Sequence, residues 1–194
     1  MYSHIQGKLV EKTPTYVIID VNGIGFQIHI SLNTYSEIGN GEACKLFTHF
    51  VVREDAHLLY GFSTETERRL FQYLVSVSGV GVNTARLILS ALSPSELYSA
   101  ITGSNIAALQ AVKGIGGKTA QRIIIDLKDK LEKEDFSSEN VAFKHNTKKD
   151  EALSGLVILG FNRNVANKAL DKVLKSNDAE ISVEQLIKSS LKIL

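Results

Sequence analysis

The sequence is poor in cysteine and has no long apolar run. Its one cysteine, Cys44, excludes an intramolecular disulfide and any zinc site built from several cysteines. No apolar run approaches the ~20 residues that a helix needs to span a bilayer, and the first residues lack the basic-then-apolar pattern of a secretory signal. We therefore predict a cytoplasmic protein without membrane contact, metal or cofactor, in which Cys44 is a buried, unreactive thiol.

The sequence also lacks an excess of either charge. Its 22 basic and 21 acidic side chains leave a formal net charge of only +1. The charge is unevenly divided: −2 for residues 1–63, +3 for 64–131, −1 for 132–150 and +1 for 151–194. A protein that binds nucleic acid typically shows a basic patch rather than a basic total. The modest excess over residues 64–131 agrees with phosphate binding there but does not establish it.

The first sixty residues have the pattern of a β-domain. Short runs rich in Val, Ile, Phe and Tyr alternate partly between apolar and polar residues, and turn-forming pairs such as Asn22-Gly23 separate them. Five strands in so short a segment predict a small barrel of the OB type, a frequent scaffold for nucleic-acid binding or oligomerisation. The predicted strands are Ile5–Val10, Tyr16–Val21, Gly25–Ile30, Lys45–Val52 and His57–Phe62.

One stretch of the sequence occurs twice, with every matching position offset by 35 residues. Leu74–Ala85 contains Gly79-Val80-Gly81, and Leu109–Ala120 contains Gly114-Ile115-Gly116. A fixed-period repeat implies one supersecondary unit used twice. Apolar residues at helical spacing flank both glycine pairs, so each copy is predicted to be a helix, a tight turn and a second helix.

The glycines of each copy permit a positive φ and a close backbone approach that a Cβ would obstruct. The apolar residue between them, Val80 or Ile115, is predicted to fold back between the two helices. Ala85 and Ala120, one turn into the second helix, allow the helices to pack closely.

Each turn should present unpaired backbone N–H groups at the start of a helix, where hydrogen bonds and the helix dipole attract anions. Phosphate is the anion we expect. For a single such turn, a plain helical hairpin with a glycine cap is the better explanation. Two copies with matched apolar, Thr and Ala positions favour phosphate binding.

Two nucleotide-binding motifs are only apparent. Gly117-Lys118-Thr119 resembles the end of a P-loop, but the required glycine five residues earlier is Val112, and the preceding segment has a helical rather than a strand pattern. The glycine pairs also lack the third glycine and the preceding strand of a dinucleotide fingerprint. ATP binding at this site is therefore not expected.

The segments after the barrel divide into helices, a linker and a small bundle. Thr64-x-x-Glu67 and Ser93-Pro94-Ser95-Glu96 are predicted capping boxes, and the last helix of the repeat is predicted to end near Leu131. The polar composition of residues 132–150 predicts a flexible linker.

We predict that the C-terminal residues 151–194 form three short helices. A bundle of this size is only marginally stable alone, and we expect it to bind a partner protein. Ser182-x-x-Gln185 caps the third helix. The apolar faces are predicted to comprise Ala152, Leu153, Leu156, Val157 and Leu159 in the first helix, Val165, Ala169, Leu170, Val173 and Leu174 in the second, and Val183, Leu186, Ile187, Leu191 and Leu194 in the third, where Ser190 interrupts the face.

The repeat, the barrel before it and the bundle after it together resemble the RuvA family of bacterial Holliday junction-binding subunits. The resemblance covers nearly the whole chain and is most specific over Phe47–Ala56 and Leu58–Phe62. It implies an α+β, multidomain fold: an N-terminal OB-like β-barrel domain (1–63), a tandem helix-hairpin-helix DNA-binding domain (64–131), a flexible linker (132–150) and a C-terminal three-helix, UBA-like domain (151–194).

The resemblance also implies function and partners. It implies a non-catalytic subunit that binds four-way junction DNA as a homotetramer, holds the junction open and square, and loads the hexameric ATPase RuvB for branch migration in recombination and repair. An octamer on DNA and the RuvC resolvase as a further partner are compatible with the resemblance.

Site residues follow from the resemblance position by position. Glu54 and Asp55, which by themselves suit a solvated turn, correspond to an acidic pin that repels phosphates at the junction centre. In the C-terminal domain, Leu153, Leu156, Leu159, Gly160 and Phe161 match the pattern of the RuvB-binding domain, although a core role explains them equally well. The DNA-contacting residues are Gly79, Val80, Gly81, Val82 and Asn83 in the first hairpin, and Gly114, Ile115, Gly116, Gly117, Lys118, Thr119 and Arg122 in the second.

The sequence departs from the family pattern at Asn83 and Gly117, where members often have lysine. These differences indicate a grip that depends chiefly on main-chain amides. Two alternatives stay open. One is a generic helix-hairpin-helix adaptor without junction preference. The other is an enzyme, either a metal-dependent nuclease that uses Glu54 and Asp55 or an NTPase that uses Lys118 and Thr119.

Overall fold

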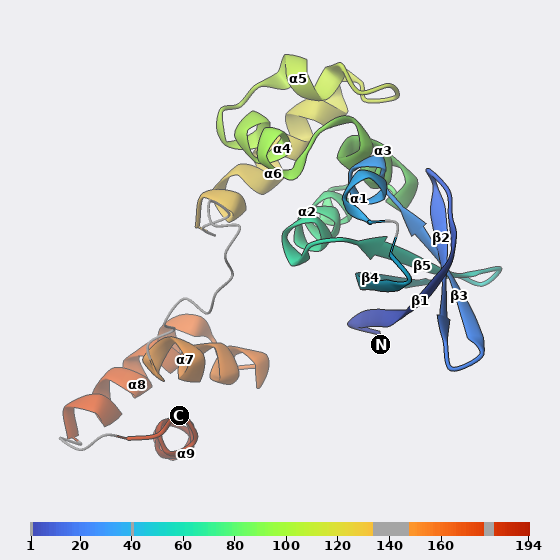
Figure 1. The fold of residues 1–194 in the computed structure, drawn as a ribbon. Coiled ribbons are helices and arrows are strands. Elements are labelled where there is room, and N and C mark those ends of the chain that lie inside the picture. Colours follow the sequence, from blue (N-terminus) through green and yellow to red (C-terminus); the bar gives the residue numbers. More distant parts are fainter. Residues whose placement is uncertain (1, 40, 134–147, 177–180) are drawn as a thin grey trace. The chain divides into compact units, whose positions relative to one another are not determined.

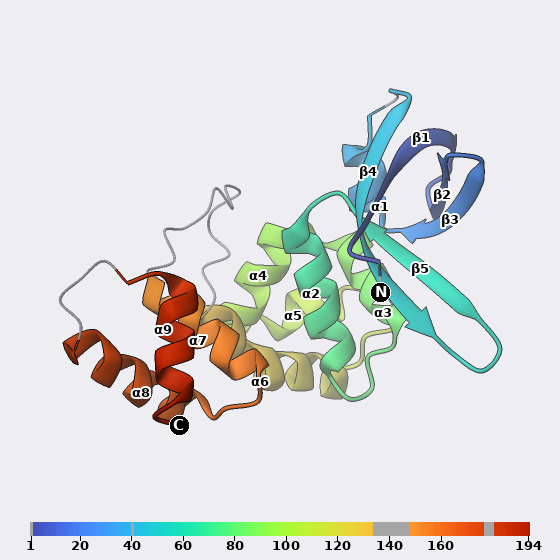
Figure 2. The ribbon, with the colours of Figure 1, turned by 90° about the horizontal axis from the view of Figure 1, so that it is seen from below.

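The structure is a computed structural model that describes residues 2–39, 41–133, 148–176 and 181–194. The chain divides into two compact units, residues 1–139 and 140–194. Figures 1 and 2 show the first unit as a strand-rich part joined directly to helices α1–α6, and the second as helices α7–α9. Residues 134–147, the greater part of the predicted linker, lie outside the described residues.

The strands of the first unit close into a barrel, as the sequence predicted, and their order around it is β1-β2-β3-β5-β4. All neighbours pair antiparallel except β3 and β5, which form a short parallel pair. Cys44 lies in the barrel core, and burial raises the pKa of its thiol. The strands are β1 (His4–Lys12), β2 (Tyr16–Val21), β3 (Ile24–Ile30), β4 (Ala43–Val52) and β5 (His57–Phe62).

A short helix that the sequence analysis did not predict, α1 (Leu32–Glu37), connects β3 to β4. Ser31 begins it by accepting a hydrogen bond from the backbone N–H of Thr34. The helix has only six residues. A segment so short carries too few positions for an apolar periodicity to be recognised.

The remaining helices of this unit form the two hairpins and their connection. Ser93 and Glu96 form the predicted reciprocal capping box. Thr64 also caps its helix, but the return bond from Glu67 that we predicted is wrong, because the Glu67 carboxylate is turned into the protein. The helices are α2 (Glu65–Ser76), α3 (Val82–Ala91), α4 (Pro94–Thr102), α5 (Ile106–Gln110) and α6 (Gly117–Lys133).

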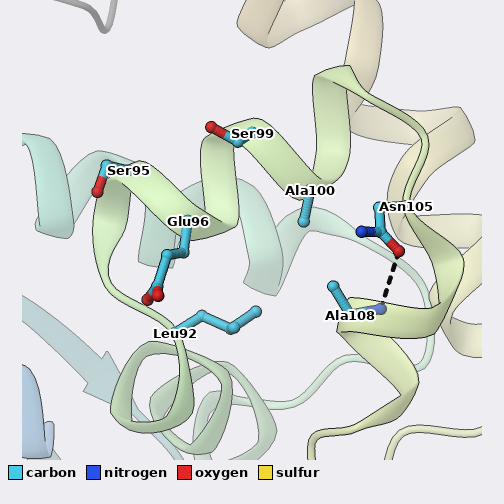
Figure 3. A pocket seen from close by; sticks show the side chains of 7 residues that line it. All are labelled: Leu92, Ser95, Glu96, Ser99, Ala100, Asn105 and Ala108. Atoms are coloured by element: carbon cyan, nitrogen blue, oxygen red, sulfur yellow. Dashed lines mark hydrogen bonds between the residues drawn. The ribbon is translucent and has the colours of Figure 1, made fainter.

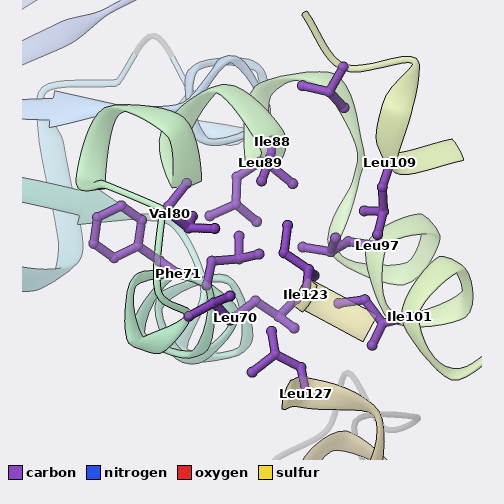
Figure 4. Packing of buried hydrophobic residues seen from close by; sticks show 14 of the residues in the cluster. Leu70, Phe71, Val80, Ile88, Leu89, Leu97, Ile101, Leu109, Ile123 and Leu127 are labelled. Carbon is purple, nitrogen blue, oxygen red and sulfur yellow. The ribbon is translucent and has the colours of Figure 1, made fainter. Parts of the chain in front are cut away.

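The barrel and the hairpins share one hydrophobic core, and Figure 4 shows its part among the hairpin helices. Tyr60 and Phe62 of β5 contact Phe71 of α2, with ring centroids 5.2 and 4.9 Å apart. Val80 of the first turn and Ile123 of α6 are buried in the same cluster. Because close-packed cores deform little, this shared core makes the barrel and both hairpins one body.

Burial of Glu67 makes the stability of the protein depend on pH. Removal of the carboxylate from water raises its pKa above the ordinary 4.5; hydrogen bonds from Ser31, Thr34 and Ser63 lower it in part, and the nearby Glu37 raises it. The folded state therefore binds this proton more tightly than the unfolded state does. The contribution of Glu67 to the free energy of unfolding consequently falls as the pH rises from 4.5 through the raised pKa, and is level above it.

We expect denaturant titrations at a series of pH values to show this fall as a difference between the wild-type protein and Glu67→Gln, whose side chain does not titrate. The slope of the difference should reach at most about 1.4 kcal/mol per pH unit. A difference that is constant from pH 4.5 upward would contradict the assignment.

The second unit consists of α7 (Lys148–Ile158), α8 (Arg163–Ser176) and α9 (Val183–Leu191). Ser182 and Gln185 form the predicted capping box of α9. Helices α6 and α7 extend into the ends of the predicted linker, to Lys133 and from Lys148, whereas its flexibility stays a prediction.

The predicted apolar faces of this bundle are only partly confirmed. Residues of all three helices form the core: Ala152, Leu153, Leu156, Ala166, Leu170, Val173 and Leu186. Ser190, predicted to interrupt the face of α9, is fully buried, and its hydroxyl has no hydrogen-bond partner among the described residues. The prediction is wrong for several residues whose side chains are exposed: Val157, Leu159, Val165, Leu174, Leu191 and Leu194. In the described part of the chain, no helix is long and apolar enough to cross a membrane.

Candidate nucleic-acid interface

The first glycine turn joins α2 to α3 and is held by its own backbone. The N–H of Val80 donates to the carbonyl of Val77 at 3.0 Å, and Gly79 has a φ of +90°. Val80 is 4% exposed, so it is buried between the helices as predicted. Gly81 begins α3 without a side-chain cap, and the first N–H groups of a helix have no intrahelical acceptor. The turn therefore presents free donors at the start of α3.

The second turn repeats this construction 35 residues later. Ile115 donates to the carbonyl of Val112 at 3.1 Å, Gly114 has a φ of +90°, and Ile115 is 6% exposed. The helix that follows also begins identically, because Ala120 donates to Gly116 at 2.9 Å as Ala85 donates to Gly81 at 2.9 Å. The repeat in the sequence is thus a repeat of hydrogen bonds.

The two glycines of each turn have different reasons to be glycine. Gly79 and Gly114 need the left-handed conformation, which side chains rarely adopt. Gly81 has a φ of −84°, which any residue tolerates, and Gly116 is not among the described residues with positive φ. Apart from the neighbouring residues in the sequence, a Cβ at either position would meet no atom of the described residues within 4 Å. The fold therefore does not need glycine at Gly81 or Gly116, and the space beside them is open to an outside molecule.

The predicted basic and polar side chains around the turns have mixed roles. Lys118 is exposed in the first turn of α6, where the structure has a helix and no P-loop. Arg122 is exposed but donates to the carbonyl of Ser78 at 3.2 Å, so it links the second hairpin to the first turn. The sequence analysis missed Lys113, which is exposed directly before Gly114; its position beside the repeat glycine was the available signal.

Asn83, predicted to contact DNA, also contacts the barrel. Its Oδ1 accepts a hydrogen bond from the Tyr60 hydroxyl at 3.4 Å. Burial raises the pKa of Tyr60, so the hydroxyl keeps the proton that it donates. The Asn83 side chain is exposed apart from this contact, and the family-typical lysine would not accept the bond.

The two carboxylates at the β4–β5 turn lie at the tip of a projecting hairpin. The N–H of Arg53 donates to the carbonyl of Ala56 at 2.9 Å and closes the turn. Glu54 and Asp55 are exposed, and Figures 1 and 2 show the tip beyond the other strands. Within the described ranges, no group of three or more His, Cys, Asp or Glu side chains could hold a metal ion.

The predicted partner-binding residues of the second unit differ in how exposed they are. Leu153 and Leu156 are 7% and 0% exposed, so they form core and are not available to a partner. Gly160 ends α7 with a φ of +98°, and Phe161 is half-buried against the core. Leu159 is 60% exposed.

An open depression of about 420 Å³ lies between α4 and α5 (Figure 3). Its one carboxylate, Glu96, already accepts hydrogen bonds from the N–H and hydroxyl of Ser93, which lower its pKa. No residue of either glycine turn contributes to it, and we assign it no role. The lining residues are Leu92, Ser95, Glu96, Ser99, Ala100, Asn105 and Ala108.

Models of three known protein families together match most of the chain. A model described as the RuvA N terminal domain matches residues 1–61, a SAM-like helix-hairpin-helix tandem matches residues 71–129, and the RuvA C-terminal domain matches residues 147–194.

Curated relatives are similar over their whole length. Proteins named Holliday junction branch migration complex subunit RuvA are 52% identical over 194 residues in Christiangramia forsetii and 47% identical over 195 in Flavobacterium psychrophilum. The protein of that name from Cytophaga hutchinsonii is 44% identical over 198 residues. In each case the match covers 100% of both chains.

Proposed function

The chain belongs to the RuvA family, and from this membership we propose that it binds Holliday junctions as the non-catalytic DNA-binding subunit of a branch-migration complex. The observation that carries the proposal is the pair of identical glycine turns on one rigid body, each with free N–H donors and open space beside Gly81 or Gly116. Two turns of this kind bind two phosphates of one duplex arm.

The proposed recognition depends on shape and not on base sequence. Backbone amides directed at phosphates carry no information about bases. Lys113, Lys118 and Arg122 add positive charge around the second turn without adding base contacts. The grip should therefore work equally on arms of any sequence.

We propose a homotetramer, with one junction arm for each subunit. Four copies would bring eight carboxylates of Glu54 and Asp55 to the junction centre. Two like charges 4 Å apart repel by about 1 kcal/mol in water and by more in a less polar site. This repulsion of phosphates would keep the junction open and square.

The experiment that tests the proposal compares DNA substrates of matched length in a gel-shift titration. We expect the four-way junction to bind at least about tenfold more tightly than linear duplex, a difference of ~1.4 kcal/mol. The logarithm of the affinity should fall with the logarithm of salt concentration by about 0.9 per neutralised phosphate. Equal affinities would support the generic helix-hairpin-helix adaptor instead.

Two further measurements test the size of the assembly and the enzyme alternative. The mass in solution with and without junction DNA distinguishes one tetramer from two. Incubation of the pure protein with junction DNA, Mg²⁺ and ATP tests the enzyme alternative. Cleaved strands or released phosphate would support that alternative.

We further propose that the protein acts in the cytoplasm and that the RuvC resolvase is another partner of the same complex.

We propose that the ATPase RuvB binds the second unit at an exposed apolar surface, which we call the α7–α8 patch. It comprises Val157, Ile158, Leu159 and Val165, which are 38%, 85%, 60% and 53% exposed. All four lie within five residues of Gly160 in the sequence, on either side of the turn that joins the two helices. Exposed apolar residues on so small a unit are typical of a protein-binding surface.

Aspartate in place of Leu159 is expected to weaken RuvB binding at least about 30-fold, or ~2 kcal/mol, because a charge would be buried in an apolar contact. The fold should be unaffected, since the side chain is largely exposed. Calorimetry with purified RuvB measures the effect, and Lys192→Glu serves as an exposed control in the same unit. Equal weakening by both variants, or by neither, would show that the α7–α8 patch is not the docking surface.

A further inference from the structure

Glu67 is the one charged side chain among the described residues that is buried, with 0% exposure. It lies in the first turn of α2, where the acidic side chain of a capping box would normally reach the helix start in solvent. A buried carboxylate without partners costs several kcal/mol. Its surroundings must therefore compensate it.

Two hydroxyl groups at the start of α1, one on its N-cap residue and one in its first turn, provide that compensation. Ser31 donates to Oε1 of Glu67 at 2.5 Å, and Thr34 donates to Oε2 at 2.6 Å. The hydroxyl of Ser63 lies 3.4 Å from Oε2. Each oxygen of the carboxylate thus has its own donor.

The direction of these bonds is fixed by backbone donors. The N–H of Thr34 donates to the Ser31 hydroxyl at 2.9 Å, and the N–H of Ser63 donates to the Thr34 hydroxyl at 3.2 Å. Because an N–H can only donate, each hydroxyl directs its own hydrogen at Glu67. The pocket therefore directs one hydroxyl hydrogen at each oxygen of the Glu67 side chain. Only a carboxylate offers two acceptor oxygens in these positions.

The network joins three parts of the first unit. Ser31 and Thr34 belong to the connection between β3 and β4 of the barrel, Ser63 follows β5, and Glu67 belongs to the first helix of the hairpins. Nearby bonds cross the same boundary: Leu32 donates from its N–H to Ser90 of α3 at 3.1 Å, and Arg86 of α3 donates to the carbonyl of Thr15 at 3.1 Å. Figure 1 shows α1 between the barrel and the hairpin helices.

We propose that Glu67 is a positioning residue that fixes the barrel, which carries the acidic tip, relative to the helices that carry the glycine turns. Apolar residues of similar volume would stabilise this boundary as well or better, because a buried charge gains little net stability. Unlike an apolar contact, a fully paired polar network is satisfied in one arrangement only. Its consequence for junctions rests on the proposed function, since the tip must meet the junction centre while the turns hold the arms.

The test uses the full chain with spin labels at two exposed positions, Gln27→Cys on the barrel and Ala107→Cys on α5, in a Cys44→Ala background. Double electron–electron resonance measures the distribution of distances between the two labels. We expect one narrow distribution for the parent chain and a broadened or shifted one for Glu67→Gln, because the amide of Gln opposes a hydroxyl hydrogen. Ile101→Val, a core change outside this network, controls for lost stability and should leave the distribution unchanged.

Thr34→Val provides a second variant that keeps side-chain volume and removes one donor. In gel shifts, both network variants should lower the ratio of junction affinity to duplex affinity at least about fivefold, while duplex affinity stays the same. Unchanged distances in both folded variants would overturn the proposal whatever the DNA result. Altered distances between the labels, in a protein that shows no junction preference, would support the positioning role of Glu67 and reject the proposed function.

Discussion

Valine in place of Gly81 or Gly116 is expected to abolish tight DNA binding while the fold is retained. Neither glycine is held by a positive φ, and within the part of the chain that the structure describes a Cβ at either position would meet no atom within 4 Å beyond its sequence neighbours. The branched side chain would instead occupy the space that a phosphate needs. Each hydrogen bond to a charged group contributes about 1.5–3 kcal/mol, so the loss of one clasp should weaken junction binding at least about 100-fold.

The stability cost of these variants should be at most about 1 kcal/mol, because valine is a poor residue at a helix start. Junction affinity by fluorescence anisotropy and the midpoint of chemical denaturation separate the two effects. Gly25→Val on the barrel is the matched control, since its Cβ would meet only Ile18 at an ordinary 3.5 Å. Wild-type affinity in both Gly81→Val and Gly116→Val would rule out the proposed phosphate clasps.

Alanine at Gly79 or Gly114 should show the opposite behaviour. Both glycines have a φ of +90°, which costs a residue with a side chain about 1–2 kcal/mol. We expect a lower denaturation midpoint, with DNA affinity reduced only as far as the turn is distorted. The contrast between the two glycines of one turn distinguishes a conformational role from a ligand-binding role.

Neutralisation of the tip, by Glu54→Gln together with Asp55→Asn, is the second change with a large expected effect. Removal of the repulsion between carboxylates and phosphates should raise affinity for the junction about tenfold, a gain of ~1.4 kcal/mol. The same change should reduce the control of strand separation at the crossover. Branch migration by the complex with RuvB is therefore expected to change in rate.

Gel shifts measure the affinity, and a strand-exchange assay with RuvB and ATP measures the rate. Asp129→Asn with Glu132→Gln removes the same charge from exposed positions on α6 and controls for net charge. An effect of equal size in this control would attribute the result to overall charge. Indifference of both assays to the tip variant would favour an adaptor without junction preference.

Much of the fold could be predicted because its signals are local. Alternation of apolar and polar residues located all five strands, and Ser93 and Ser182 marked helix starts where side chain and backbone lie three residues apart. The 35-residue offset even predicted matched turns, since equal sequences with equal neighbours make equal hydrogen bonds. The candidate site residues at these turns could be named from the sequence for the same reason, and their contact with DNA stays a prediction.

Features that depend on distant partners could not be predicted. Glu67 fits a capping box, yet it bonds Ser31 and Thr34, more than thirty positions earlier in the chain. Asn83 and Arg122 likewise fit the role of DNA contacts, and the structure adds bonds to Tyr60 and Ser78. Nothing in the local pattern states which distant hydroxyl or carbonyl will lie within reach.

The sequence by itself determined the two glycine turns that we propose to bind phosphate, because a glycine that needs a positive φ and a free helix start are properties of a few consecutive residues. Tertiary structure alone decided which apolar residues of the C-terminal helices stay exposed, as Leu159 does, and where Glu67 is buried. Exposure and burial depend on the elements that pack against a residue. Those elements are brought together only by the folded chain.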